Sequence, residues 1–387
     1  IYLGALNMTM IAGYRLKNGG FLQADILLTS SKNTPLSPFQ IPSFSPSVDS
    51  TPLMTHTVVG LCQKILVVNK YFAVAFAGSV NEIIKATYLI DKLLAEKIKL
   101  TGKRFIDTLI KNQINKLALT AIVLSVEDNE IKLTNFGAEP SISNKYFELH
   151  VGGSGAEHAK NYYKQFPIAV FDIPEDDIVV HGTCMALQQF ANHLIEEYED
   201  QFESESIIDL FGGGFELVSY YNGQFQKISD VVYAYAEAEF NADGTLQVDH
   251  PKFLLRSTYQ DNHLKIRSVV RWQYEEESEY TTRNDRTFTT FPVTCFPSTF
   301  VKDECKDISF VGEFLCFIIK VKGVHGSFTI PFIRKYDQLV GFLAKAFIAC
   351  TEKDNVDFIY SETFKQELEE RVINYMKMVR QEMKLTK

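Results

Sequence analysis

The stretch that most constrains the fold is residues 9–25, TMIAGYRLKNGGFLQAD, which has the pattern of a strand, a turn and a second strand. Residues 9–14 are short and apolar, and the KNGG of residues 17–20 tolerates the positive φ angles of hairpin turns. Antiparallel pairing would return the second strand to the start of the first. The pattern therefore predicts that Thr9 and Asp25 lie at the same end of one hairpin. Taken alone, it is also typical of an ordinary hairpin with a chance threonine.

Length and composition bound the class of protein. The chain has 387 residues, which suggests two or three domains at about 100–200 residues per domain. Hydrophobic residues make up 46% and charged residues 22%, as in ordinary globular proteins. The net charge of −9 argues against broad nucleic-acid binding, because that function usually needs a basic face.

The cysteines and histidines show no metal-site pattern. None of the six cysteines forms a CxxC pair, and no metal-ligand spacing joins them to the eight histidines. We therefore expect reduced, buried thiols in a cytoplasmic protein, and no cofactor. No apolar run reaches the roughly 18 residues that a membrane helix needs, so no membrane association is expected.

The start of the chain leaves a choice open. The chain begins with Ile1, and Met8 directly precedes Thr9. Residues 1–8 are interpreted as a pro-segment, a cloning remnant or a misassigned start, and Met8 could itself be the initiator.

A second segment repeats the pattern of paired strands. Residues 63–79 read QKILVVNKYFAVAFAGS, in which Lys64 opens a buried strand and a polar turn follows at residues 69–70. A run of small residues then ends at Gly78.

Together the two segments resemble the catalytic β-type subunits of the proteasome and their bacterial relatives. In that family an aspartate follows the nucleophilic threonine by sixteen residues, as Asp25 follows Thr9, and a lysine precedes a glycine by fourteen, as Lys64 precedes Gly78. Two glycine-rich stretches of the family also follow in order, VGGSG at residues 151–155 and DLFGGG at 209–214. The resemblance covers residues 9–235.

The resemblance implies an α+β fold in which two antiparallel sheets lie between two helix layers, the four-layer αββα sandwich of N-terminal nucleophile hydrolases. Periodicity is compatible with it, because helical patterns alternate with runs of strand-like residues. The expected helices cover residues 79–98, 102–117, 155–165 and 181–200. Residues 236–387 lie outside the resemblance and predict a second α+β domain of unknown role, with helices at 335–350 and 362–384.

The resemblance also implies a chemistry. A threonine hydroxyl is a weak nucleophile, and an N-terminal Thr9 would carry its own base, an α-amine with a pKa of about 8. Lys64 would keep that amine neutral by like charge, and Asp25 would hold Lys64 in place. The Gly78 N–H would stabilise the oxyanion. Ser154 and Asp209 would orient the amine and its water.

One departure from the family keeps other functions open. The family often has a serine three residues after the counterpart of Asp209, and here Gly212 stands at that position. The first interpretation is a threonine-type endopeptidase acting on peptides or unfolded proteins, as a ring-like homo-oligomer that could work with an unfoldase. The alternatives are an inactive proteasome-like scaffold and an amidase for a small amide.

The expected substrate site lies next to this chemistry. By resemblance, the backbone of Thr29 would bind the substrate strand, and Leu28, Leu66 and Phe76 would line a shallow apolar pocket that favours small or medium apolar side chains. Phe76 could instead pack between its sheet and the following helix. Residues 30–59, rich in proline and serine, predict an inserted loop that is either disordered or a flap beside the site.

Overall fold

Two units divide the chain, one formed by Ile1–Ile228, Gln260–Leu264 and Thr289–Lys302 and the other by the remaining residues. The protein is α+β with mostly antiparallel sheets. The computed structural model describes residues 9–16, 19–30, 40–44, 56–143, 147–165, 175–221, 223–272, 282–293, 314–323, 326–335, 347–352 and 355–385.

The first unit contains a six-stranded antiparallel sheet in the order β12-β11-β2-β1-β10-β9. The predicted hairpin is present: β1 pairs with β2, Ile11 lies opposite Ala24, and the Asp25 N–H donates to the Met10 carbonyl (3.1 Å). Turn residues 17 and 18 lie outside the described residues. The strands are β1 (Ile11–Leu16), β2 (Gly19–Asp25), β9 (Glu139–Ser143), β10 (Phe147–Gly152), β11 (Phe215–Tyr221) and β12 (Gln224–Lys227).

A four-stranded sheet packs against one face of the six-stranded sheet. Side chains alternate along its strand β6, so Ala73, Ala75 and Ala77 face the six-stranded sheet while Phe72 and Phe76 face the other way. Its strands, in spatial order, are β5 (Ile65–Asn69), β6 (Phe72–Gly78), β7 (Leu119–Glu127) and β8 (Glu130–Phe136). A separate pair is formed by β3 (Leu27–Ser30) and β4 (Thr57–Leu61).

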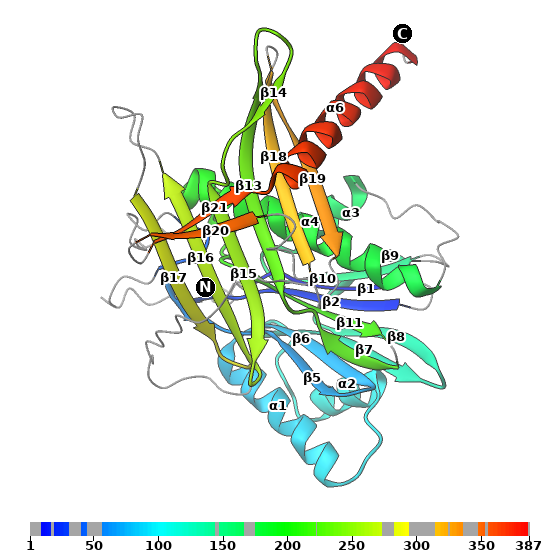
Figure 1. Cartoon of the computed structure of the whole chain (residues 1–387). Helices are drawn as coiled ribbons and strands as arrows, with labels where there is room; N and C mark the ends of the chain where they lie inside the picture. The colour runs from blue at the N-terminus through cyan, green and yellow to red at the C-terminus, as the bar shows by residue number, and fades with distance from the viewer. Residues whose placement is uncertain are drawn as a thin grey trace. The chain divides into compact units, whose positions relative to one another are not determined.

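Helices cover the outer faces of both sheets (Figure 1). Helices α1 (Val80–Ala95) and α2 (Gly102–Lys111) lie on the four-stranded sheet, and α2 begins where the Thr101 hydroxyl accepts the Arg104 N–H. Helices α3 (Ala156–Gln165) and α4 (Glu175–Asp200) lie on the six-stranded sheet. All four predicted helices are therefore present, although α4 begins at Glu175 instead of 181 and α2 ends at Lys111 instead of 117. A 3₁₀ turn (Gln201–Glu203) and the short helix α5 (Glu205–Ile208) follow α4.

The second unit is built on a seven-stranded sheet, against which helix α6 (Glu362–Leu385) packs Phe364, Leu368 and Val372. Its central strands β13 and β18 are parallel. The strands are β13 (Val231–Phe240), β14 (Leu246–Val248), β15 (Phe253–Gln260), β16 (His263–Trp272), β17 (Thr282–Thr290), β18 (Phe314–Gly323) and β19 (Gly326–Lys335). A two-stranded sheet joins β20 (Phe347–Glu352) to β21 (Asn355–Tyr360).

Two expectations about this second half need correction. The expected boundary at residue 235 falls inside β13, whereas the units divide at Ile228/Ser229, because β13 pairs with β15 and β18 over its length. The helix expected at 335–350 is also wrong at both ends: Lys335 closes β19, and residues 347–350 belong to β20. Residues 336–346 lie outside the described residues, whereas the final predicted helix is present as α6.

The two sheets of the first unit pack closely at Gly13, so a substitution there tests this packing. A Cβ atom added there would lie 2.4 Å from the Ile122 methyl and 3.0 Å from the Leu133 methyl. We expect Gly13→Ala to lower the free energy of unfolding by about 1–3 kcal/mol, because overpacking forces neighbouring side chains out of place. Chemical denaturation measures this loss, and a variant as stable as the wild type would contradict the packing described.

Candidate active site

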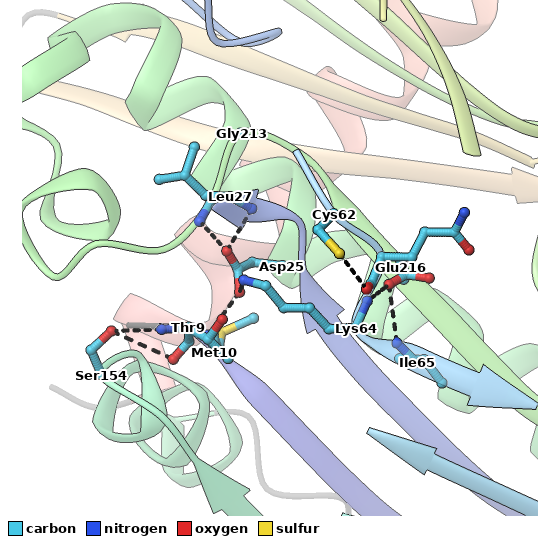
Figure 2. Close-up of polar contacts among 12 residues, drawn as sticks. Thr9, Met10, Asp25, Leu27, Cys62, Lys64, Ile65, Ser154, Gly213 and Glu216 are labelled. Atoms are coloured by element: carbon cyan, nitrogen blue, oxygen red, sulfur yellow. Dashed lines mark hydrogen bonds and ion pairs between the residues drawn. The ribbon is translucent and has the colours of Figure 1, made fainter. Parts of the chain in front are cut away.

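A glycine-rich turn holds the backbone of Thr9, which precedes β1. The Thr9 N–H donates to Ser154 Oγ (3.1 Å), and the Gly155 N–H donates to the Thr9 carbonyl (3.1 Å). Gly153 has φ +87°, and a Cβ atom there would lie 1.9 Å from the Thr9 carbonyl oxygen. Only glycine therefore allows this approach. The structure brings Ser154 to Thr9, as the resemblance implies (Figure 2).

The carboxylate of Asp25 is fully buried and receives four donors. Its Oδ1 accepts from the Met10 N–H (2.9 Å) and from Lys64 Nζ (2.6 Å). Its Oδ2 accepts from the N–H groups of Leu27 and Gly212, both at 3.0 Å. These donors compensate the burial of the charge, which would otherwise be very unfavourable.

The ammonium of Lys64 lies beside the start of β1, because Lys64 Nζ and the Met10 N–H bind the same oxygen of Asp25. Its side chain is 8% exposed. Thr9, the residue before Met10, is itself 2% exposed. The structure thus brings Thr9, Asp25, Lys64 and Ser154 together from four separate segments of the chain (Figure 2).

A second buried carboxylate fixes the backbone of Lys64. Glu216 on β11 accepts from the N–H groups of Lys64 (2.5 Å) and Ile65 (3.3 Å), and Lys227 Nζ lies 3.8 Å from its Oε2. Burial lowers the pKa of Lys227, and the neighbouring Glu216 opposes that shift. Sequence reasoning missed Glu216; its signal is a lone acidic residue in the apolar run 215–218.

Gly78 ends β6 with φ +122°. The N–H of Phe76 donates to the Lys64 carbonyl (2.9 Å). Because N–H groups two residues apart point to the same edge of a strand, the Gly78 N–H belongs to the edge of β6 that faces Lys64. Its role as an oxyanion donor stays a prediction.

The expected substrate-binding residues occupy two places. Phe76 is fully buried in the core between the four-stranded sheet and α1, and Leu66 packs partly against that core. This is the packing arrangement considered as the alternative, and a pocket role for these two residues stays a prediction. Leu28 and Thr29 lie half-buried on β3, where Thr29 is opposite Val58 of β4. One edge of β3 is therefore already paired.

Asp209 contacts a histidine, and its expected role in orienting the Thr9 amine and its water stays a prediction. Its Oδ2 lies 2.7 Å from His158 Nε2, and its side chain is 47% exposed. Among the hydrogen bonds of the described residues, none joins Asp209 to Thr9 or Ser154. Asp209 follows the C-terminus of α5, which points it to His158 on α3.

A third buried carboxylate, Glu197 on α4, contacts the loop of Gly212 and Gly213, which also binds Asp25. Its Oε2 accepts from Ser43 Oγ (2.5 Å) and the Gly213 N–H (3.0 Å), and its Oε1 accepts from Ser206 Oγ (2.8 Å). Burial raises the pKa of the Glu197 carboxyl to about 7, and these three hydrogen bonds oppose the rise. Sequence reasoning missed it, although Glu197 continues the buried stripe of Phe190 and Leu194.

Comparison with known proteins assigns no family: no family model matches the chain, and no curated protein matches it. In the parts of the chain that the structure covers, no cluster of three or more His, Cys, Asp or Glu side chains could hold a metal ion. None of the described helices is long and apolar enough to cross a membrane. Cys62, Cys184 and Cys316 are free thiols.

The Lys64–Asp25 pair can be tested by a double-mutant cycle. We expect Lys64→Met alone to lower the free energy of unfolding by about 3–5 kcal/mol, because it leaves a buried carboxylate without its cation. Adding Asp25→Asn should recover part of that loss. Urea titrations of the wild type, both single variants and the double variant measure the coupling, and strictly additive effects would contradict a direct pair.

The raised pKa of Glu197 predicts a pH dependence of stability. Between pH 4.5 and about 7 the folded state keeps a proton that the unfolded state has lost, so stability should fall as pH rises through this window. The full effect corresponds to about 3 kcal/mol. Glu197→Gln cannot titrate, so the difference between its unfolding free energy and that of the wild type should change across this window. A pH-independent difference would contradict the pKa shift.

Proposed function

We propose that the first unit is an N-terminal nucleophile hydrolase, a threonine-type endopeptidase in which Thr9 attacks peptide bonds. The observation that carries the proposal is the shared Asp25 oxygen, which binds both Lys64 Nζ (2.6 Å) and the Met10 N–H (2.9 Å). A buried ammonium beside the backbone of a threonine is the arrangement that this chemistry needs.

The packing of the first unit supports the same proposal. Two antiparallel sheets share an apolar core, and a pair of helices covers the outer face of each. We therefore assign the unit to the four-layer αββα sandwich. The β1–β2 hairpin places Thr9 and Asp25 at one end of the six-stranded sheet.

In the proposed reaction, Thr9 is the first residue of the mature chain after the Met8–Thr9 bond is broken. Its α-amine takes the hydroxyl proton as Oγ1 bonds to the substrate carbonyl carbon, and the carbonyl oxygen becomes an oxyanion. The ammonium of Lys64 disfavours prior protonation of the amine. Ser154 Oγ, which already contacts the Thr9 nitrogen, orients it.

The second half of the reaction returns the proton. The Gly78 N–H stabilises the oxyanion, the C–N bond of the substrate breaks, and the amine leaving group takes the proton from the Thr9 ammonium. This leaves an ester between Thr9 Oγ1 and the acyl fragment. A water molecule, deprotonated by the α-amine, hydrolyses the ester and restores the free threonine.

An inactive proteasome-like scaffold is the second candidate, and one observation favours it. Asp209 pairs with His158 instead of reaching Thr9, so one of the groups expected to orient the amine is engaged elsewhere. A site that retains the Lys64–Asp25 ion pair but lacks Asp209 at the amine could have a structural role and no catalytic one. Turnover distinguishes the two candidates.

The test combines mass and activity. Intact-mass measurement should find Thr9 as the first residue of active protein, because an amide nitrogen cannot act as the base. A fluorogenic peptide panel and a set of small amides should then show peptide hydrolysis, with small or medium apolar residues preferred before the cleaved bond. Thr9→Ala should leave only background, and Thr87→Ala, a buried threonine on α1, should retain full activity.

Three outcomes would count against this assignment. Active protein that keeps residues 1–8 would reject Thr9 as an N-terminal nucleophile. Absence of turnover on every substrate, with Thr9 exposed, would favour the scaffold. Hydrolysis of small amides alone would point to an amidase.

A further inference from the structure

The loop formed by Gly212 and Gly213 joins two buried carboxylates. The Gly212 N–H donates to Asp25 Oδ2 and the Gly213 N–H donates to Glu197 Oε2, each at 3.0 Å. These consecutive N–H groups are therefore fixed from opposite sides. The next residue, Gly214, accepts the Ile26 N–H (3.1 Å), which ties the loop to the chain just after Asp25.

We propose that Glu197 is a positioning residue for the candidate active site: it holds the Gly212–Gly213 loop in the conformation that binds Asp25, and Ser43 of the inserted segment completes this support. The effect on hydrolysis rests on the proposed function, whereas the coupling of Glu197 to Asp25 does not.

The conformation of the Gly212–Gly213 loop needs contacts that stabilise it. Gly212 and Gly213 have φ angles of +119° and +72°, in a region that residues with side chains rarely occupy. Glycine also loses more conformational entropy on folding than any other residue. A fixed acceptor behind the loop is therefore needed to keep the Gly212 N–H directed at Asp25.

Glu197 also explains why position 212 is a glycine. A Cβ atom at Gly212 would lie 2.0 Å from Glu197 Oε1. That oxygen is held by Ser206 Oγ and has no solvent to move into, because Glu197 is fully buried. A serine at this position, which the proteasome family often has, would collide with Glu197. In this chain the polar group behind the loop comes from α4 instead.

The described part of the insertion packs behind the same loop. Ser43 Oγ donates to Glu197 Oε2 (2.5 Å), and the rings of Phe44 and Phe202 meet edge to face at 5.0 Å. The side chain of Ile41 lies 3.3 Å from where a Cβ atom of Gly213 would stand. Residues 41–44 are all buried. This part of residues 30–59 therefore acts as a support beneath the site.

The proposed chain of contacts runs from the insertion to the ammonium. Ser43 and Ser206 fix the Glu197 carboxylate, Glu197 fixes the loop, and the loop supplies one of the four donors to Asp25. Loss of that donor would let Asp25 turn and carry Lys64 away from Thr9. The expected consequence is a lower kcat with little change in KM, because the substrate itself touches none of these groups.

The experiment measures amide hydrogen exchange and hydrolysis in the same set of variants. Glu197→Ala removes the acceptor of the Gly213 N–H, whereas Glu197→Gln keeps an oxygen that can accept it. Glu196→Gln is the matched control, because Glu196 is the next residue on α4 and binds the Glu205 N–H instead of the loop. Exchange is followed by mass spectrometry in peptides that cover residues 25–27 and 211–214.

Glu197→Ala should raise exchange in both peptides about tenfold or more, the factor that the loss of a buried hydrogen bond of typical strength would give. Its kcat should fall about 10-fold to 100-fold, the range found in metal sites when hydrogen-bond partners of the ligands are removed. In Glu197→Gln, the exchange rates and kcat should both stay within about threefold of the wild type. That factor corresponds to a smaller free-energy change than the loss of a typical hydrogen bond. Glu196→Gln should change neither.

Unchanged exchange at residues 25–27 in Glu197→Ala would overturn the coupling. Raised exchange with an unchanged kcat would overturn the role in hydrolysis. If the wild type hydrolyses nothing, the proposed function fails, and the exchange data still decide whether Glu197 positions Asp25. Should Glu197→Ala not fold, Ser43→Ala leaves the carboxylate in place and should raise exchange at 211–214; no rise there would also overturn the proposal.

Discussion

The ion pair between Lys64 and Asp25 is the interaction on which the rest of the site depends. Both side chains are almost fully withdrawn from water, so each needs the other. Three backbone N–H groups complete the coordination of the carboxylate, and they come from the start of β1, the start of β3 and the loop before β11. A single carboxylate therefore sets the relative positions of three chain segments and one ammonium.

Two glycine residues allow the close backbone contacts that shape the site. At Gly153 the chain passes so close to the Thr9 carbonyl that no Cβ atom fits, and at Gly212 it passes equally close to Glu197. Both glycines have positive φ angles. Close approach of the backbone lets N–H groups, whose positions do not depend on rotamers, bind the polar atoms of the site. The positions of these donors are therefore set by the backbone fold and not by side-chain rotamers.

Local patterns predicted much of this arrangement. The hairpin of β1 and β2 followed from two short strand patterns joined by the KNGG turn, and the proximity of Thr9, Asp25, Lys64 and Ser154 followed from a resemblance that retains their spacing. The role of Asp209 at the amine stays a prediction, and spacing along the chain does not reveal that His158 contacts its carboxylate.

Two groups of features could not be read from the sequence. Glu197 and Glu216 stand among apolar residues, which signals a buried acid, but their partners are mostly backbone N–H and hydroxyl groups on other elements, and the sequence does not reveal those partners. Residues 347–350 were predicted as the end of the helix at 335–350 and instead begin β20, because a short apolar run fits both helix and strand.

The separation along the chain of the contacting groups has a consequence for folding. Thr9 contacts Ser154 across 145 residues, and Asp25 contacts Gly212 across 187. Contacts between such distant positions form late, because the intervening chain must first lose its loop entropy. A nascent chain would thus carry an unassembled Thr9 until β11 has joined the sheet. In the proposed enzyme, Thr9 would therefore become reactive only after these long-range contacts have formed.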